Sequence, residues 1–469
     1  MNFFASAQLT KDEKMPLSPD YKPDPQFERL GGTFSDPVTA AEFPKTILRY
    51  RNNPAAETVG LHALTDEEWI KHFGRFEPLP ENMPQPRAMR YHGHQFRSYN
   101  PDLGDGRGFL FAQLRDRDDR LLDLGTKGSG QTPYSRAGDG RLTLKGGVRE
   151  VLAAALLQAR GVNTSKAFSL IETGEALQRN DEPSPTRSAV LVRLNHSHIR
   201  FGTFQRHAYH KDTNALEELV EHVRKHYLPE ANDPAALVRS ATQRAAKLCA
   251  QWMAAGFVHG VLNTDNMTVT GESFDYGPFR FAPTFDPGFT AAYFDHSGLY
   301  AFARQPEAVF WNCRALASTL VSISDEQALI SALEAFEPAY RTALRDAVFS
   351  RLGICATDDL ESDIEFVRDT FSLLETSKAP WEPFFYKWFG GNARWAIPDS
   401  GEKDWAIAFA KYDPDRPERL EAAYFQQGEP CDLLYDEIEV IWDAIDREDD
   451  WTAFEEKIAE INNVYSELK

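Results

Sequence analysis

The spacing of hydrophobic residues predicts a strand-rich segment in the first half of the chain. From about residue 104, a glycine-rich turn, an apolar run, a charged turn and a second apolar run predict a β-hairpin that ends near Lys127. Residues 145–162 then carry apolar side chains at helical spacing, and Gly161 is expected to end this helix. The runs 166–175 and 188–207 are both interpreted as further strands.

The pattern becomes helical after about residue 206. Residues 215–228 and 235–257 carry apolar side chains along one face, as amphipathic helices do. A loop rich in proline and aromatic residues follows, and helices are expected from about residue 311 to the end of the chain. Before the strands, residues 64–76 predict one short helix that Thr65 could cap.

Strands first and helices second, with a lysine on an early strand and a glutamate on the next helix, is the order of the protein-kinase fold. We therefore expect an α+β protein with a two-lobed, kinase-like arrangement and extensions at both ends. The expected parts are an N-terminal extension packed on the core (1–100), a nucleotide-binding N-lobe (101–206), a helical C-lobe with the catalytic and metal loop (207–380) and a helical C-terminal extension (381–469).

Composition excludes several classes of function. The chain has 469 residues, 42% of them hydrophobic and 26% charged, which is typical of a soluble globular protein with several structural units. Its net charge of −20 argues against binding to nucleic acid or to anionic membranes, because both need clustered cations. No apolar run is long enough to span a membrane, and the first residues resemble neither a secretory signal nor a transit peptide. The four cysteines are far apart, which favours a reducing compartment, and we expect a cytoplasmic monomer.

Residues 259–277, HGVLNTDNMTVTGESFDYG, resemble a kinase catalytic loop that lacks its base. Val261 stands where kinase-like phosphotransferases place an aspartate. Asn266 and Asp275 offer the hard oxygen ligands that Mg²⁺ or Mn²⁺ prefers, with phosphates completing the coordination shell. Asp265 is free to accept a proton from a hydroxyl group. The alternative interpretation is that these Asp and Asn residues only shape turns.

Glycines and arginines in the strand-rich segment form a candidate phosphate site. Glycine lets backbone NH groups approach an anion, and arginine offers a forked donor that matches phosphate. Lys127 and Glu150 fit the pair with which kinases direct an ammonium group at a nucleotide. Taken singly, each residue is as well explained as a turn former, an exposed side chain or a salt-bridge partner. The other candidates are Gly104, Gly106, Arg107, Asp139, Gly140, Arg193 and Arg200.

Longer sequence blocks resemble one known family. Seven blocks occur in order between residues 90 and 313, about half of the chain: HGHQF, LGDGRG, KGSGQTPYSRAGDGR, VREVLAAALL, IRFGTF, HGVLNTDNM and DYGPF. Together they are similar to the selenoprotein O family of kinase-like protein adenylyltransferases. The resemblance implies a pseudokinase-like, two-lobed fold that binds ATP in the reverse orientation. It also implies transfer of AMP to Ser, Thr or Tyr hydroxyls of protein substrates, with release of pyrophosphate.

The resemblance also implies a role for each matching residue. Asp265 corresponds to the catalytic proton acceptor, and Asn266 and Asp275 correspond to ligands of Mg²⁺ or Mn²⁺. Glu150 corresponds to the partner of Lys127. The implied ATP-binding set comprises Gly104, Gly106, Arg107, Lys127, Asp139, Gly140, Glu150, Arg193, Arg200 and Asp275.

The C-terminal part of the sequence does not show the family's pattern. From about residue 380 the family's usual tail is not recognisable, and no cysteine follows Cys431. A redox gate between a tail cysteine and a central cysteine is therefore not expected. Residues 91–96 and 384–391, which are rich in aromatic side chains, are interpreted as core packing and turn closure.

Three alternatives to AMP transfer stay open at the level of the sequence. The chain could be a non-catalytic nucleotide-binding pseudokinase that acts as a scaffold, it could transfer UMP from UTP, or it could be an ordinary phosphotransferase. The intact Asp265, Asn266 and Asp275 favour an enzyme over a scaffold. Val261, in place of a kinase base, disfavours an ordinary phosphotransferase.

Overall fold

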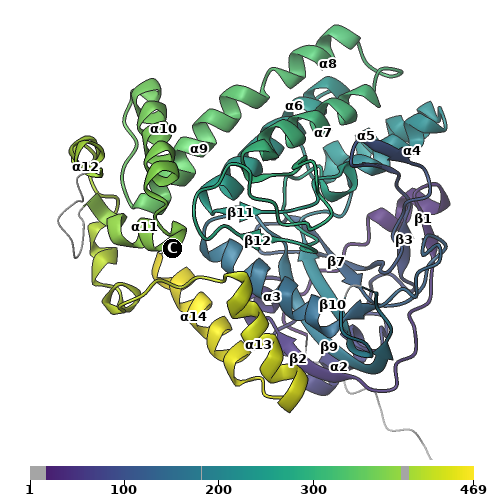
Figure 1. The fold of residues 1–469 in the computed structure, drawn as a ribbon. Helices are drawn as coiled ribbons and strands as arrows, with labels where there is room; N and C mark the ends of the chain where they lie inside the picture. The colour runs from purple at the N-terminus through teal and green to yellow at the C-terminus, as the bar shows by residue number, and fades with distance from the viewer. Residues whose placement is uncertain (1–16, 181, 392–400, 469) are drawn as a thin grey trace, which may run out of the picture.

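The computed structural model describes residues 17–180, 182–391 and 401–468. It shows a mixed α+β protein in which a curled antiparallel sheet is followed by a mostly helical part (Figure 1). No helix in these ranges is long and apolar enough to cross a membrane. The strands are β1 (Ser35–Pro37), β2 (Ile47–Arg51), β3 (Arg87–Met89), β4 (Gly93–Gln95), β5 (Ser98–Asn100), β6 (Leu110–Arg115), β7 (Leu121–Lys127), β8 (Leu142–Thr143), β9 (Lys166–Leu177), β10 (Thr186–Asn195), β11 (Phe257–Val258) and β12 (Arg280–Phe281). The α-helices are α1 (Asn53–Thr58), α2 (Asp66–Phe73), α3 (Leu144–Ala159), α4 (Phe201–Tyr209), α5 (Thr213–His226), α6 (Pro234–Ala254), α7 (Gln305–Ser318), α8 (Glu326–Leu333), α9 (Phe336–Leu352), α10 (Leu360–Ser377), α11 (Trp381–Trp388), α12 (Lys403–Phe409), α13 (Tyr435–Glu448) and α14 (Thr452–Leu468).

The main sheet of the described chain runs in the order β1-β3-β6-β7-β10-β9-β2, with β8 paired to β10. Neighbouring strands are antiparallel throughout this sheet. Strands β1, β2 and β3 come from the first hundred residues, and β1 and β2 form the two edges. The N-terminal part of the chain is therefore integrated into the sheet that carries the candidate site.

The hydrophobic pattern predicted several of these elements correctly. The hairpin of β6 and β7 ends at Lys127, and α3 ends just before Gly161, which has a φ of +80°. Helix α2 begins after Thr65, as predicted. The Thr65 hydroxyl accepts a hydrogen bond from the backbone NH of Glu68 (3.2 Å), and the Glu68 carboxylate accepts one from the backbone NH of Thr65 (2.7 Å). This reciprocal capping box fixes the start of the helix.

The predicted strand over residues 188–207 is wrong in its second half. The run divides into β10, which ends at Asn195, and helix α4, which begins at Phe201. Phe201 and Phe204 are both fully buried, and helical spacing puts residues three apart on one face, so the helix places both rings in the core. Arg200 therefore lies at the start of a helix and not within a strand.

Alternation along the strands decides which side chains turn toward α3. In β10, Val190 packs in the cluster that includes α1 and α2, whereas Leu191 packs in the cluster that includes α3. Arg193 lies two residues after Leu191 and therefore shares its face of the sheet. Lys127 in β7 shares a face with Leu121, which also packs in the α3 cluster. The sheet thus directs both cations toward α3.

Helices α13 and α14 lie beside α3 and the strand β2 (Figure 1). The Lys145 ammonium group, in the first turn of α3, pairs with the carboxylate of Glu439 on α13 at 2.7 Å. Ile438, Ile441 and Phe454 of the two C-terminal helices join the hydrophobic cluster that contains the buried face of α3. The C-terminal helices therefore support the helix that carries Glu150.

A second contact ties the end of α13 to the sheet. The Asp449 carboxylate pairs with Arg49 of β2 at 2.8 Å and with Arg187 of β10 at 2.6 Å. Both arginines also pair with the buried Glu172 of β9, at 2.7 and 2.8 Å. The Arg187 hydrogen bond and the other contacts of Asp449 lower its pKa to about 2. Three strands and the C-terminal helices meet in this one network.

We predict that Asp449→Asn lowers the thermal stability by the equivalent of about 1 kcal/mol at neutral pH, because the exposed carboxylate is screened by solvent. The low pKa of Asp449 means that its contribution is present at neutral pH and is lost as the pH falls through about 2. Asparagine tolerates the left-handed backbone at this position, where φ is +51°.

The measurement is the midpoint of thermal unfolding at low salt and at about 1 M NaCl, where the Debye length is about 3 Å. Asp446→Asn, an exposed residue on the same helix without an ion pair among the described residues, is the matched control. Equal midpoints for both variants at low salt would contradict the importance of this network.

Candidate active site

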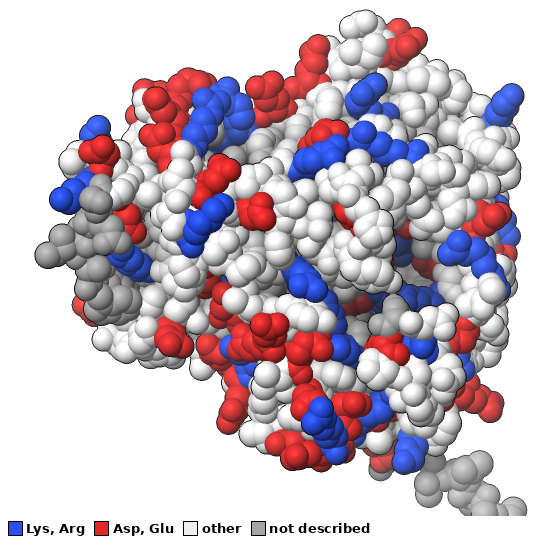
Figure 2. Space-filling view, in the orientation of Figure 1, with Lys and Arg blue, Asp and Glu red and all other residues white. Residues whose placement is uncertain are grey.

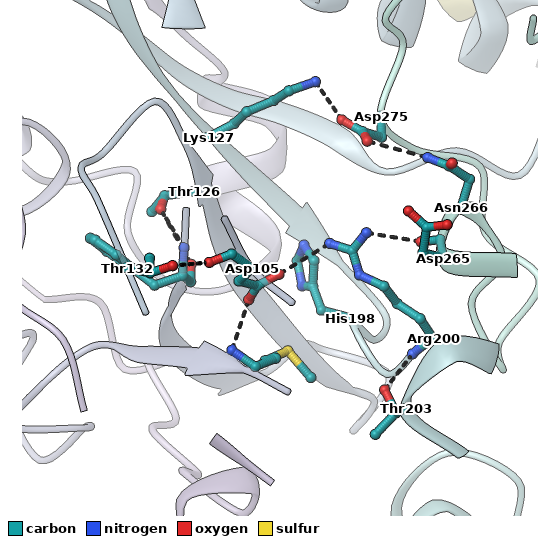
Figure 3. A network of polar contacts seen from close by, with 12 residues as sticks. Asp105, Thr126, Lys127, Thr132, His198, Arg200, Thr203, Asp265, Asn266 and Asp275 are labelled. Atoms are coloured by element: carbon teal, nitrogen blue, oxygen red, sulfur yellow. Dashed lines mark hydrogen bonds and ion pairs between the residues drawn. The ribbon is translucent and has the colours of Figure 1, made fainter. Parts of the chain in front are cut away.

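Lys127 and Glu150, the predicted kinase-like pair, meet in the structure. The ammonium group of Lys127, at the end of β7, pairs with Glu150 of α3 and with Asp275 of the loop after β11. Only 5% of the Lys127 side chain and 3% of the Glu150 side chain are exposed. Asp275 is far from the other two residues in sequence, and Figure 3 shows the side chains of Lys127 and Asp275 pointing toward each other.

Asp275 is surrounded by positive charge. Its Oδ1 lies 3.5 Å from a guanidinium nitrogen of Arg193, and its Oδ2 accepts a hydrogen bond from the side-chain amide of Asn266 at 3.2 Å. Burial would raise the pKa of Asp275, but Lys127 and Arg193, with smaller contributions from Arg107 and Arg200, hold it well below its ordinary value. Asp275 is therefore ionised at any physiological pH.

The buried guanidinium groups of Arg193 and Arg200 each have NH donors without a hydrogen-bond partner among the described residues. Arg193 lies 3.8 Å from Glu150 and 3.5 Å from Asp275, yet its Nε and Nη1 atoms have no hydrogen-bond partner in the described chain. Arg200 donates from Nη1 to the backbone oxygen of Asp265 at 2.9 Å, and its Nε is likewise without a partner there. Buried donors without partners are costly, so these positions suit an anion.

Rings and a carboxylate hold Arg200 in place. Its guanidinium lies 4.4 Å from the centre of the Tyr91 ring and 4.9 Å from that of Phe274. Its Nη2 lies 3.3 Å from the carboxylate of Asp105, which also accepts a hydrogen bond from a backbone NH of β3. Arg200 is therefore a fixed cation beside Asp265.

Asp265 lies in a single 3-10 turn, Thr264–Asn266, and differs from Asp275 in its surroundings. Its Oδ1 atom is buried and has no hydrogen-bond partner among the described residues. Burial raises the pKa of Asp265 to about 6, although the positive charge of Arg200 opposes this shift. A carboxylate with a pKa near 6 is ionised at pH 7 and basic enough to accept a proton.

The segment that contains β4 lies against the loop that carries Asp265. A Cβ atom on Gly93 would stand 2.8 Å from Oδ1 of Asp265, so a side chain at this position would press on the candidate base. The backbone NH of His94 donates to the Thr264 hydroxyl at 2.7 Å. Residues 91–96 were expected only to pack the core, and the structure shows that they also hold the loop that carries Asp265.

The glycines before β6 pack against the loop between β7 and β8. A Cβ on Gly104 would stand 2.3 Å from the Tyr134 ring, and one on Gly106 would stand 2.9 Å from the Tyr134 backbone oxygen. This close approach explains why both positions are occupied by glycine, which has no Cβ atom.

Arg107 is exposed and has no ion pair within the part of the chain that is described, and it helps to lower the pKa of Asp275.

Asp139 and Gly140 lie in the same loop, but their observed contacts are local. The Asp139 carboxylate accepts a hydrogen bond from the Arg141 backbone NH at 3.0 Å and pairs with Arg179 at 2.8 Å. Gly140 has a φ of +70°, and its backbone oxygen accepts a hydrogen bond from the NH of Gly130 at 3.1 Å. No hydrogen bond or ion pair between described residues joins Asp139 to the group around Lys127 and Asp275.

The donor set around Asp275 fits a hard divalent cation that a nucleotide helps to bind. The Asn266 amide and the Asp275 carboxylate are adjacent, and both carry oxygen atoms of the type that Mg²⁺ and Mn²⁺ prefer. No group of three or more His, Cys, Asp or Glu side chains in the described ranges could hold a metal ion by itself. Additional ligands would therefore have to come from phosphate and water. Figure 2 shows a recess to the right of centre with Lys and Arg atoms on its floor.

Comparisons with known proteins place the chain in a family. The family model described as protein adenylyltransferase SelO matches residues 19–462. The chain belongs to the SelO family. It is 44% identical to the protein nucleotidyltransferase YdiU of Synechocystis sp., covering 94% of this chain and 98% of that protein. YdiU of Gloeobacter violaceus is also 44% identical, over 96% of both chains, and YdiU of Pseudomonas aeruginosa is 37% identical over 77% of this chain and 74% of its own.

The match to the SelO family corrects one expectation from the sequence. The family's tail was not recognisable beyond about residue 380, yet the family model continues to residue 462. The match therefore includes α13 and most of α14, the helices that support α3. Residues 384–391 fulfil the packing role expected of them, since Phe384, Phe385 and Trp388 are buried.

Sequence reasoning missed several residues that shape this SelO-family site. Asp105, Tyr91 and Phe274 position Arg200, and Gly93 leaves room for the Asp265 carboxylate. Asp105 and Gly93 do lie within the blocks that resemble the family, but nothing in their local pattern shows which distant side chain each one contacts. Their roles depend on contacts across more than 90 residues of chain.

We predict opposite stability changes when the two carboxylates are made neutral. The raised pKa of Asp265 means that its ionised form destabilises the fold above about pH 6, whereas below its ordinary pKa the difference disappears. Asp265→Asn should therefore gain about 1 kcal/mol at pH 8, with allowance for its partial exposure. The lowered pKa of Asp275 means that its ionised form stabilises the fold above its ordinary pKa, so Asp275→Asn should lose stability at pH 8.

Thermal unfolding of both variants and the unaltered protein at about pH 8 and pH 4 provides the measurement. The gain for Asp265→Asn should shrink toward pH 4. A loss of stability for Asp265→Asn at pH 8 would show that its carboxylate has a stabilising partner and is not held free.

Proposed function

We propose that this chain transfers AMP from ATP to Ser, Thr or Tyr hydroxyls of protein substrates and releases pyrophosphate. The observation that carries the proposal is the presence of two carboxylates in different surroundings. Asp265 has an oxygen without a hydrogen-bond partner among the described residues and a raised pKa, whereas Asp275 is enclosed by cations. Membership of the SelO family, whose model is described as a protein adenylyltransferase, supports the same reaction.

The proposed architecture is a kinase-like fold with two lobes. Residues 101–206 supply the nucleotide-binding lobe and residues 207–380 the helical lobe with the catalytic loop. Residues 1–100 and 381–469 are extensions, and the second of these supports α3 from outside the site. The pairing of Lys127 with Glu150 supports this comparison with kinases, because kinases hold their nucleotide-directing lysine in the same way.

The proposed nucleotide site uses fixed cations to hold the phosphates. Lys127, Arg193 and Arg200 surround the position of Asp275, and the exposed Arg107 lies close enough to influence its pKa. Glu150 orients Lys127. The complete proposed set is Gly104, Gly106, Arg107, Lys127, Asp139, Gly140, Glu150, Arg193, Arg200 and Asp275.

Asn266 and Asp275 are the proposed ligands of Mg²⁺ or Mn²⁺. When bound, the cation supplies positive charge to phosphate oxygens. Lys127 and the arginines provide the remaining charge, and they stabilise the negative charge that develops on the departing pyrophosphate. Because these groups are fixed by buried contacts, little reorganisation is needed during the reaction.

Asp265 is the proposed proton acceptor. The acceptor hydroxyl oxygen forms a bond to the α-phosphorus while its proton passes to the Asp265 carboxylate. The bond from the α-phosphorus to the oxygen that bridges to the β-phosphorus breaks, and that oxygen leaves with pyrophosphate. This chemistry requires the α-phosphate next to Asp265, so ATP binds in the reverse orientation to that found in kinases. A kinase base at the position of Val261 is not needed.

Labelled nucleotides distinguish this reaction from its alternatives. The purified protein is incubated with protein acceptors and ATP labelled at the α or the γ position. We expect protein-bound label from the α position alone. Label from the γ position would indicate a phosphotransferase, and no label at all would indicate a nucleotide-binding scaffold. More label from α-labelled UTP than from α-labelled ATP would replace AMP with UMP as the transferred group.

We predict that Asp265→Ala and Asp275→Ala fail in different ways. Asp265→Ala should lower the rate of AMP transfer by about 10²–10⁴-fold and leave nucleotide binding intact, because it removes only the proton acceptor. Asp275→Ala should weaken ATP binding as well, because it removes a proposed metal ligand and the centre of the cation cluster. Calorimetric titration with ATP and Mg²⁺, together with a transfer assay, provides the measurement.

The pH dependence gives a further check on Asp265. Since its pKa is about 6 and only the ionised form accepts a proton, kcat/KM should fall as the pH drops through about 6.

Equal loss of ATP binding in the Asp265→Ala and Asp275→Ala variants would show that Asp265 is a ligand or a structural residue and not the base.

A further inference from the structure

Two adjacent aromatic side chains are exposed in the loop between β12 and α7. Tyr293 is 77% exposed and Phe294 is 42% exposed, and their ring centres are 5.1 Å apart. Tyrosine and phenylalanine lose little conformational entropy when they form contacts, because each side chain has only two rotatable bonds. An exposed pair of this kind is typical of surfaces that bind other proteins.

Hydrogen bonds to Asp295, the residue that follows Phe294, fix the turn after the two rings. The Asp295 carboxylate accepts hydrogen bonds from the backbone NH of Leu299 at 2.9 Å and of Tyr300 at 2.8 Å. It also accepts one from the Ser297 hydroxyl at 3.2 Å. The turn after Phe294 is thereby fixed, and the exposure of the pair is a property of an ordered loop.

The aromatic pair is connected to the candidate base by a short series of contacts. The ring of Phe294 lies 5.8 Å from that of Phe96, whose backbone NH donates to the Asn263 side-chain oxygen at 3.0 Å. The Tyr300 hydroxyl donates to the same oxygen at 2.8 Å. Asn263 precedes Asp265 by two residues, a separation of at most about 7 Å. The loop that carries the pair therefore packs on the segment that carries Asp265, through the side chains of Phe96 and the buried Asn263.

The charged residues near this surface are paired with one another. Arg97 pairs with Glu307 at 2.7 Å, and Arg304 pairs with the same carboxylate at 3.3 Å. The Arg97 guanidinium also lies 5.7 Å from the centre of the Trp311 ring. Because Arg97 and Arg304 share one carboxylate, one net positive charge remains in this group, and the exposed rings are what favours an apolar side chain.

We propose that Tyr293 and Phe294 bind an apolar side chain of the acceptor protein close to the hydroxyl that is modified. The inference rests on the proposed function, because a protein hydroxyl that reaches Asp265 must bring its flanking chain across the adjoining surface. The contact path from Asp265 to Phe294, which runs through the side chains of Asn263 and Phe96, is about seven extended residues long. The preferred acceptor therefore carries a large apolar residue within about seven positions of its Ser, Thr or Tyr.

Two synthetic peptides with a single tyrosine test this specificity. One peptide has leucine and phenylalanine at the positions around the tyrosine, and the other has serine and asparagine there. Transfer from α-labelled ATP is measured as kcat/KM for each peptide. We expect the unaltered protein to prefer the apolar peptide by about tenfold, in line with partial burial of one large apolar side chain.

Variants locate the preference on the surface. Tyr293→Ser combined with Phe294→Ser should reduce the ratio of the two kcat/KM values toward one, whereas Tyr293→Phe should keep it because the ring remains. Ile407→Ser is the matched control, since Ile407 is 66% exposed on α12, which lies at the left edge of the view, whereas β12 lies near its centre (Figure 1). Nucleotide affinity, measured by calorimetry, should be the same in all of these variants.

Three results would overturn the inference. The first is an equal rate for both peptides with the unaltered protein, or a preference that persists in the double serine variant. The second is label on intact proteins but on neither peptide, which would place recognition elsewhere. The third is a dimer of the unaltered protein that the double serine variant does not form, which would make the surface a contact between two copies. Absence of α-label from every acceptor would instead refute the proposed function itself.

Discussion

The enclosure of the Asp275 carboxylate by cations is the interaction on which the rest of the site depends. A carboxylate with only 27% of its side chain exposed needs close positive charge, and Lys127 and Arg193 provide it. Those two cations reach Asp275 because β7 and β10 are neighbours whose side chains alternate, so that both residues face α3. Asp275 in turn occupies a left-handed backbone position with a φ of +66°, which turns its carboxylate toward the sheet. The cluster therefore joins the sheet, α3 and the loop that carries Asp275 electrostatically.

The same cluster explains why neighbouring carboxylates have different chemistry. Asp275 is held ionised by the surrounding cations, whereas Asp265 has one buried oxygen without a hydrogen-bond partner among the described residues and a raised pKa. Two carboxylates with separated pKa values can divide their roles, one binding charge and the other moving a proton. The C-terminal helices act on this arrangement from outside, because they pack on α3 and so support Glu150. Their inclusion in the SelO family match is consistent with a structural role for the tail.

The sequence predicted those parts of the site that follow from local periodicity. Lys127 and Glu150 could be paired in advance, because a strand end and the following helix were both evident from spacing. Arg200 was misplaced, since the apolar Ile199 and Phe201 alternate with polar residues as they would in a strand. Only the burial of Phe201 and Phe204 on one helical face favours α4. Contacts between distant segments, such as Gly93 beside Asp265, have no local signature. The tail was not recognised from short sequence blocks, although the family model extends to residue 462.

The orientation of the nucleotide is the central claim, and a crystal structure with a non-hydrolysable ATP analogue tests it most directly. A methylene group in place of the oxygen between the α- and β-phosphorus atoms prevents release of pyrophosphate and keeps the nucleotide intact. The account predicts that the α-phosphorus is the phosphorus atom nearest to the Asp265 carboxylate, with the β- and γ-phosphates among Lys127 and the arginines. A γ-phosphorus nearest to Asp265, as in a kinase, would contradict it.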